Sequence, residues 1–196
     1  MRQITMWNQV TADGFFAARD GGLDWVVHDP EVQRAGIAAM PDGDLLLFGR
    51  KTYDMFAAHW PRVLENPKLD DPHGGPAAPE LLTFARWLTD TPKLVFSTTL
   101  GKPSWANTRV VRDFDPREVA AIKQQTGKGI LIMGSASIVA QLTQHGLIDE
   151  YQFSVSPVMI GSGRTLFHDL ARRTKLSLLE SRAFPSGTVL LRYARA

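Results

Sequence analysis

The sequence contains no cysteine, which excludes disulfide bonds, thiolate metal sites and a cysteine nucleophile. It has no apolar run near the ~18 residues that a membrane-spanning helix needs, so we expect no membrane contact. It lacks an excess of one charge, because its 22 lysines and arginines are scattered and balanced by 20 acids, which disfavours nucleic-acid binding. No signal-peptide pattern follows Met1. These absences favour a cytoplasmic protein that acts on a small-molecule substrate.

Several catalytic signatures are also missing. The chain has no G-x-x-x-x-G-K-[ST] phosphate loop, no G-x-G-x-x-G fingerprint after a strand and no G-x-S-x-G nucleophile elbow. Its five histidines do not pair at i,i+3 or i,i+4, the spacing that places two ligands on one helix face, so we predict no metal site. The chemistry must therefore come from residues outside these motifs.

Short apolar runs are typical of strands that are buried on both faces, as in a parallel sheet between two helix layers. Such runs lie at residues 45–48, 94–96 and 130–133. Between them, helix start and stop signals and helical spacing of apolar residues predict helices over 79–90, 115–127 and 136–145, with another that opens at Pro30.

The last third of the chain changes to the alternating pattern of half-buried strands. Further strands are predicted at residues 2–10, 108–111, 151–156, 175–183 and 188–194. The last two flank Pro185-Ser186-Gly187 and form a hairpin. The whole pattern predicts one α/β domain over residues 1–196, with about eight strands in a mixed sheet that ends in antiparallel strands.

One compositional break interrupts this pattern at residues 61–79, which contain five prolines and the pair Gly74-Gly75. A loop longer than ~15 residues inside a compact domain is usually functional or mobile. Two interpretations stay open for this segment: a mobile cover over the substrate side, or a solvent-exposed insertion.

Three of the predicted buried strands run into small, hydroxylic or basic residues. These segments are Gly49-Arg50-Lys51-Thr52, Ser97-Thr98-Thr99 and Gly134-Ser135-Ala136-Ser137. The carboxyl ends of parallel strands are where open α/β sheets bind ligands, and free amides at the following helix start favour a phosphate. Arg50 and Lys51 oppose the helix dipole, an arrangement that an anion between them would explain. Alternatively, glycine and serine only cap helices at these places.

Several segments stand in an order and spacing that are found together in one family. They are Thr11–Ala17, Asp20–Trp25, Gly49–Tyr53, Gly134–Ser137, Leu147–Tyr151, Pro157–Gly163 and Leu166-Phe167. In this order they resemble dihydrofolate-reductase-like proteins. The resemblance is closer to stand-alone relatives of the reductase domain at the C-terminus of the bifunctional riboflavin-biosynthesis enzyme, the RibD C-terminal type. It spans essentially the whole chain.

The resemblance implies a dihydrofolate-reductase-like three-layer sandwich with a mixed eight-stranded sheet, an NADPH cofactor and a homodimer. Arg50 and Thr52 would contact the adenosine phosphates, Ser97 and Thr98 would flank the adenine ribose, and Gly134–Ile138 would cradle the pyrophosphate. The full set of cofactor residues implied in this way is Gly49, Arg50, Lys51, Thr52, Ser97, Thr98, Thr99, Gly134, Ser135, Ala136, Ser137 and Ile138.

The resemblance also implies an NADPH-dependent reductase of a small heterocyclic substrate, similar to 5-amino-6-(5-phosphoribosylamino)uracil reductase of riboflavin biosynthesis. Candidates for an aromatic substrate pocket are Trp25, Tyr53, Phe56 and Trp60, although aromatic residues at such spacing also form cores. Asp13 and Asp29 are the candidate catalytic residues, and Asp13 has the alternative role of a turn residue.

Two other functions stay open. Dihydrofolate reductases hold the pterin with a carboxylate on their first helix, whereas here Asp29 and Glu31 lie one residue to either side of the corresponding place. Dihydrofolate reduction proper is therefore one alternative, and a folate-dependent assay would distinguish it. A protein that binds NADP without turnover is the other.

Overall fold

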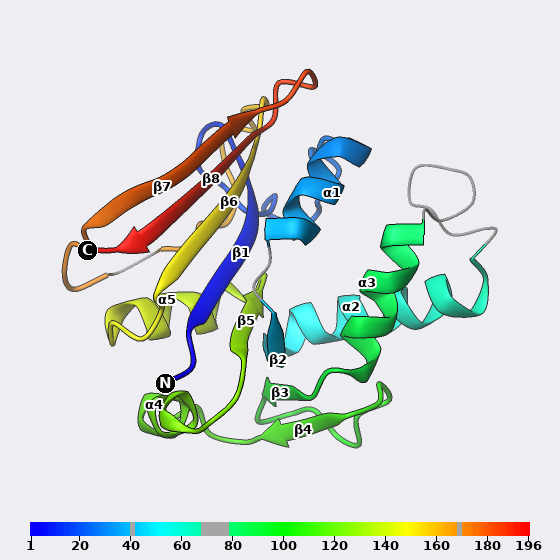
Figure 1. The fold of residues 1–196 in the computed structure, drawn as a ribbon, viewed down its shortest axis with the longest axis vertical. Coiled ribbons are helices and arrows are strands. Elements are labelled where there is room, and N and C mark those ends of the chain that lie inside the picture. Colours follow the sequence, from blue (N-terminus) through cyan, green and yellow to red (C-terminus); the bar gives the residue numbers. More distant parts are fainter. Residues whose placement is uncertain (40–41, 68–78, 168–169) are drawn as a thin grey trace.

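The computed structural model describes residues 1–39, 42–67, 79–167 and 170–196. In these ranges, eight strands form one sheet in the order β4-β3-β2-β5-β1-β6-β8-β7 (Figure 1). The strands are β1 (Ile4–Thr11), β2 (Gly43–Gly49), β3 (Lys93–Phe96), β4 (Thr108–Val111), β5 (Gly129–Met133), β6 (Glu150–Ser156), β7 (Leu176–Ala183) and β8 (Val189–Arg195). β1 to β6 are parallel, and β8 pairs antiparallel with β6 and β7. The predicted mixed sheet with antiparallel C-terminal strands is confirmed.

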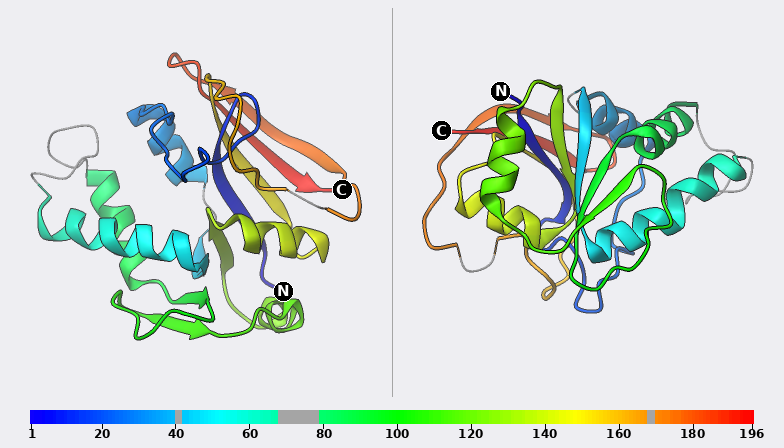
Figure 2. Two further views of the ribbon diagram at one scale, coloured as in Figure 1. Left: turned by 180° about the vertical axis from the view of Figure 1, so that it is seen from behind. Right: turned by 90° about the horizontal axis from the view of Figure 1, so that it is seen from below.

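Helices cover both faces of this sheet. They are α1 (Pro30–Ala39), α2 (Arg50–Glu65), α3 (Pro79–Asp90), α4 (Pro116–Gln124) and α5 (Ala136–Gln144). The view from below shows α1, α2 and α3 on one face, and α4 and α5 on the other (Figure 2). The molecule is thus the three-layer sandwich that the resemblance implied.

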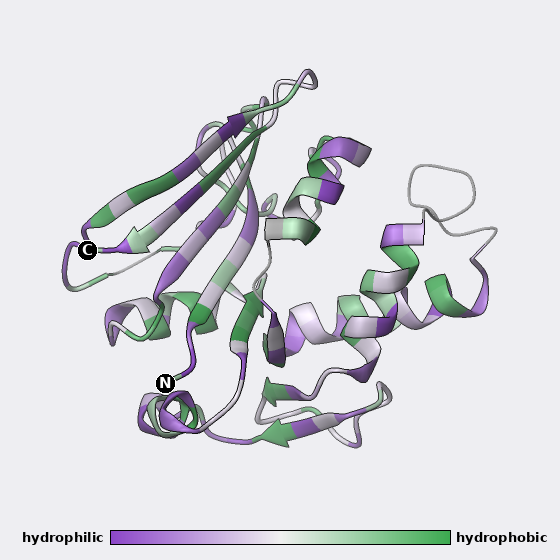
Figure 3. Ribbon diagram, viewed as in Figure 1, coloured by the Kyte–Doolittle hydropathy of each residue, from purple (hydrophilic) through white to green (hydrophobic). Residues whose placement is uncertain are grey.

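The two faces of the central strands explain the short apolar runs. In β2, Leu45 and Leu47 pack in the core beneath α4 and α5, whereas Leu46 and Phe48 pack in the core beneath α1, α2 and α3. β3 and β5 are hydrophobic over most of their length for the same reason (Figure 3). A strand covered on both sides cannot alternate between polar and apolar residues, because neither face meets water.

A partly buried ion pair lies near the amino ends of the parallel strands. The Lys123 Nζ lies 2.6 Å from the Asp149 carboxylate, which also accepts a hydrogen bond from the Ile4 N–H at 2.8 Å. Asp149 belongs to the family-like segment Leu147–Tyr151, and this segment therefore holds the start of β1 in place. The segment lies at the end of the sheet opposite to the carboxyl ends of the parallel strands.

The prediction of a loop over 61–79 is wrong for its first part. α2 continues to Glu65 with Pro61 inside it. A proline inside a helix costs about 3 kcal/mol because it removes a hydrogen bond and crowds the preceding turn. Here the fully buried Val63 packs against Leu81 and Ala85 of α3, and this burial offsets the cost. Residues 68–78 lie outside the described residues, so the cover stays a prediction. In the described ranges, no helix is long and apolar enough to cross a membrane.

Candidate functional site

A large cleft lies at the carboxyl ends of the parallel strands. Its volume is about 1570 Å³, above the ~300–1000 Å³ that is typical of a site for one small ligand. The neighbouring strands β2 and β5 form a topological switch point, because the chain leaves β2 toward β3 and leaves β5 toward β6. Ligands of open α/β sheets bind in the crevice at such a point. The cleft is therefore large enough for two ligands and lies where the fold favours them.

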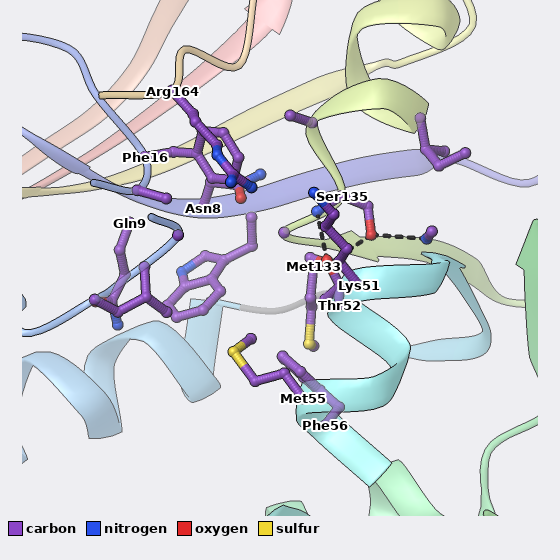
Figure 4. A pocket seen from close by; sticks show the side chains of 18 of the residues that line it. Asn8, Gln9, Phe16, Lys51, Thr52, Met55, Phe56, Met133, Ser135 and Arg164 are labelled. Atoms are coloured by element: carbon purple, nitrogen blue, oxygen red, sulfur yellow. Dashed lines mark hydrogen bonds between the residues drawn. The ribbon is translucent and has the colours of Figure 1, made fainter. Parts of the chain in front are cut away.

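The ends of β2 and β5 are joined by two hydrogen bonds. The Gly49 N–H donates to the Ser135 Oγ at 2.9 Å, and the Ser135 N–H donates to the Thr52 Oγ1 at 3.0 Å (Figure 4). Gly134 and Ser135 both have a φ of 61°, in the left-handed region. A Cβ on Gly134 would lie 3.0 Å from the Thr52 side chain, so this position needs a glycine for space as well as conformation.

Two helices begin at this junction without a side-chain cap. α2 starts after Gly49 and α5 starts after Ser135, and neither residue's side chain accepts a hydrogen bond from the helix. By contrast, Asp115 caps α4, with the Arg117 N–H at 2.8 Å, and Asp29 caps α1, with the Glu31 N–H at 2.7 Å. The first amides of α2 and α5, with the positive ends of both helix dipoles, are therefore available to an anion in the cleft.

Cationic side chains surround these helix starts. The Arg50 Nε lies 2.6 Å from the Asp54 carboxylate, and its NH1 donates to the Thr99 Oγ1 at 3.3 Å, which links α2 to the end of β3. Arg112 donates to the Leu100 carbonyl at 2.7 Å and so holds the segment that follows β3. Lys51 is exposed at the cleft wall. All the predicted cofactor residues, from Gly49–Thr52, Ser97–Thr99 and Gly134–Ile138, line this one cleft.

The other wall of the cleft is apolar and aromatic. Its side chains include Trp7, Val26, Val27, Ile37, Met55, Phe56, Trp60 and Phe84. The structure places Phe56 and Trp60 there as predicted, with ring centroids 6.0 Å apart. Trp25 and Tyr53 do not line the cleft, which corrects their assignment. Tyr53 lies on the inward face of α2, where it is 2% exposed and its hydroxyl accepts a hydrogen bond from the Trp105 N–H at 3.0 Å.

Asp13 does not line the cleft, which argues against a catalytic role. Its carboxylate accepts hydrogen bonds from the Thr11 hydroxyl at 2.5 Å and from the Ile160 and Gly161 amides at 3.1 and 2.7 Å. The Thr11 hydroxyl first, and then these amides, hold the pKa of Asp13 below its usual value. Asp13 therefore stays ionised and ties the opening loop to the loop after β6.

Asp29 lines the cleft, but its carboxylate is occupied. Besides the Glu31 amide, it accepts a weaker hydrogen bond from the Val32 N–H at 3.4 Å. The Ser186 hydroxyl is the largest cause that lowers the pKa of Asp29, and these two amides add to it. A carboxyl group with a lowered pKa is ionised at neutral pH and is a poor proton donor. The geometry supports a helix cap at Asp29 better than an acid catalyst.

Many cleft residues escaped the sequence-based prediction, among them the polar residues Asn8, Gln9 and Arg164. Asn8 is 4% exposed in β1, beside Phe16 and Arg164 (Figure 4). The Arg164 NH2 donates to the Arg19 carbonyl at 3.2 Å, so its loop braces the opening loop. The polar pair Asn8-Gln9 in a strand that is otherwise buried was the available signal, since buried polar groups usually serve a partner. Nothing local marks Arg164.

Comparisons with known proteins agree with this architecture. The chain is 29% identical to the uncharacterized protein YyaP of Bacillus subtilis strain 168 over 98% of its own length and 94% of that protein. It is 27% identical to the uncharacterized protein YwjB of the same organism over 100% of its length and 99% of that protein. The curated relatives therefore match the chain from end to end.

Solved structures share the fold at low sequence identity. A putative riboflavin biosynthesis protein from Shewanella sp. PV-4 has a TM-score of 0.69 at 19% identity, over 99% of both chains. A pyrimidine reductase-like protein from Corynebacterium diphtheriae has a TM-score of 0.65 at 13% identity, over 100% of this chain and 92% of that one. The profile of the RibD C-terminal domain matches residues 2–190. The chain is thus a member of the RibD C-terminal domain family, as its sequence motifs indicated.

Proposed function

We propose that this protein is an NADPH-dependent reductase of a small heterocyclic substrate. One observation carries the proposal: two uncapped helix starts, at α2 and α5, face the same cleft whose opposite wall is aromatic. The first feature suits a ligand with several phosphates, and the second suits a flat ring. A further protein with this fold, a diaminohydroxyphosphoribosylaminopyrimidine deaminase and 5-amino-6-(5-phosphoribosylamino)uracil reductase from Thermotoga maritima, supports the proposal, with a TM-score of 0.61 at 15% identity over 100% of this chain and 57% of its own.

The cofactor would lie across the β2–β5 junction. The amides at the start of α5, after Gly134 and Ser135, would hold the pyrophosphate, because they have no side-chain acceptor and Gly134 leaves room beside them. Arg50, Lys51 and Thr99 would hold the adenosine end, where a 2′-phosphate distinguishes NADPH from NADH. When bound, NADPH would supply the hydride.

The chain's own contribution to catalysis is positioning. The aromatic wall, with Phe56 and Trp60, would hold the substrate ring against the cofactor and exclude water from the reacting atoms. Of the described residues that line the cleft, the only acids are Asp20 and Asp29. Asp29 caps α1, and Asp20 accepts a hydrogen bond from the Gly22 N–H at 2.8 Å. Both carboxylates thus already accept amides of their own segments, and the described lining holds no third acid that could hold a pterin, which favours a RibD-like reductase over a dihydrofolate reductase.

A matched pair of glycine variants tests the cofactor site. Gly134→Ala adds a methyl group 3.0 Å from Thr52 at a positive φ, whereas Gly101→Ala adds one to open space. Titration of protein fluorescence with NADPH should show an affinity at least about tenfold lower for Gly134→Ala, and no change for Gly101→Ala. Failure of the unaltered protein to bind NADPH, or equal affinity of both variants, would contradict the proposal. Oxidation of bound NADPH by an added heterocycle then separates a reductase from a protein that only binds.

A further inference from the structure

The two ends of the cleft differ in charge, and we infer from this difference that the substrate is a flat, uncharged ring compound without a phosphate group. The inference deepens the proposed function, because it assumes that the cationic end of the cleft belongs to the cofactor. It separates this protein's substrate from the phosphorylated pyrimidine that the name of the Thermotoga maritima neighbour specifies.

The basic side chains of the described cleft lining lie outside the aromatic wall, with three around the start of α2 and the ends of β3 and β4 and the fourth against the opening loop. Among the described residues that line the cleft, the lysines and arginines are Arg50, Lys51, Arg112 and Arg164. The first two begin α2, Arg112 follows β4, and Arg164 lies beside Phe16 and Asn8 (Figure 4). The wall made by residues 23–29, by α1 and by Met55–Trp60 contributes no lysine or arginine in its described part. Apart from the histidines His28 and His59, a phosphate at that wall would meet, in the described lining, no basic side chain of the kind that usually neutralises it.

The start of α1 also disfavours a phosphate. A helix start is a natural site for an anion, and this one lies at the substrate end of the cleft. Here the Asp29 carboxylate already accepts the Glu31 and Val32 amides at 2.7 and 3.4 Å. A substrate phosphate would find these donors occupied and would meet a second negative charge. The helix start that faces the substrate is therefore closed to anions, unlike those of α2 and α5.

What this wall offers is suited to a neutral ring. Trp60 packs between Phe56 and Phe84, with ring centroids 6.0 and 5.2 Å away, and this cluster presents flat apolar surface. The polar groups here include the uncharged amides of Gln9 and Gln33. The Gln9 Oε1 is buried and has no hydrogen-bond partner within the described part of the chain. A ring N–H would satisfy this acceptor without bringing any charge.

Riboflavin and FMN provide the test, because they share one flat ring system and differ by a single phosphate. Each is titrated against protein saturated with NADP⁺, which fills the cofactor end without allowing turnover, and binding is read from flavin fluorescence anisotropy. We expect riboflavin to bind at least about tenfold more tightly than FMN. The Asp29→Asn variant keeps a good helix cap but removes the charge, so the preference should fall to within about threefold. Asp115→Asn makes the same change at the cap of α4 outside the cleft, and it should keep the full preference.

Three outcomes would overturn the inference: equal affinity for the two flavins, tighter binding of FMN, or no binding of riboflavin. An unchanged preference in Asp29→Asn would show that the α1 cap does not exclude the phosphate and would overturn the argument from that helix. Failure of the proposed function looks different, because NADP⁺ itself would then not bind. In that case the cationic end is not a cofactor site, the assumption behind the inference is wrong, and the inference falls with the proposed function.

Discussion

Arg50 offers the sharpest test of cofactor choice, through the change Arg50→Ser. Its guanidinium spans from α2 to Thr99 at the end of β3, where a 2′-phosphate would lie if the pyrophosphate is bound at α5. A charge-assisted hydrogen bond contributes about 1.5–3 kcal/mol. The Arg50 side chain is 41% exposed and its Nε is held by Asp54 at 2.6 Å, so the lower end of that range applies. About 1.5 kcal/mol corresponds to a roughly tenfold weaker affinity for NADPH.

Fluorescence titrations with NADPH and NADH measure this effect directly. NADH has no 2′-phosphate, so its affinity should change by less than about threefold in Arg50→Ser. Asp54→Asn should act in the opposite direction and strengthen NADPH binding, because it frees Arg50 from a competing carboxylate. Arg117→Ser is the control, since Arg117 also forms an exposed ion pair, with Asp115, but lies outside the cleft. If the affinities for both cofactors fall together, Arg50 holds a part that they share and the assignment to the 2′-phosphate is wrong.

Three further predictions concern the fold and the assembly. Burial lowers the pKa of Lys93 from 10.5 to about 8, so above pH 8 the unfolded chain binds more protons than the folded protein. The free energy of unfolding, measured by urea titration, should therefore rise by roughly 1.5 kcal/mol between about pH 8 and about pH 9.5. Lys93→Met should lose that rise and the exposed Lys102→Met should keep it. Asp13→Ala should speed hydrogen exchange of the Ile160 and Gly161 amides at least about tenfold, and unchanged exchange would contradict its role as a tie. We expect a homodimer through the edge strand β7, where Leu178 is 56% exposed. The Leu178→Glu variant should have the mass of a monomer in light scattering, and a monomeric unaltered protein would refute the expectation.

Local signals were enough to predict most of the fold. The runs at β2, β3 and β5 are apolar on both faces, and this property is visible in a few consecutive residues. The cap of α4 is equally local, because Asp115 meets the Arg117 amide only two positions away. Pro61 misled the prediction because the compensating contacts of Val63 come from α3, beyond residues 68–78. Packing between distant segments thus overrode a local preference.

The site was predicted less completely, for two physical reasons. Which way a helical side chain points depends on the angle of its helix against the sheet, so Phe56 reached the cleft and Tyr53 the core, although both are aromatic residues of α2. Long-range partners are the second reason. From the sequence, Asp13 was a candidate catalytic acid, because nothing near it indicates that its carboxylate accepts a hydrogen bond from the Gly161 N–H, 148 residues away. The glycine-rich strand ends were placed correctly in the cleft, because their position follows from the backbone at the carboxyl ends of the strands and not from where a side chain points.

α2 runs along the cleft and fixes the distance between its two ends. Its first turn, with Lys51 and Thr52, belongs to the phosphate end, and Met55, Phe56 and Trp60 belong to the ring end. A helix rises about 1.5 Å per residue, so Lys51 and Trp60 are held roughly 13 Å apart along one rigid axis. Pro61 follows directly after Trp60 and acts on the turn before it, so any bend that it introduces falls at the aromatic end of this stretch and leaves the turn from Lys51 to Met55 straight. In the proposed function, helix geometry would therefore set the separation between cofactor phosphates and substrate ring, and a residue inserted between positions 52 and 55 would turn the aromatic side chains by about 100° away from the cleft.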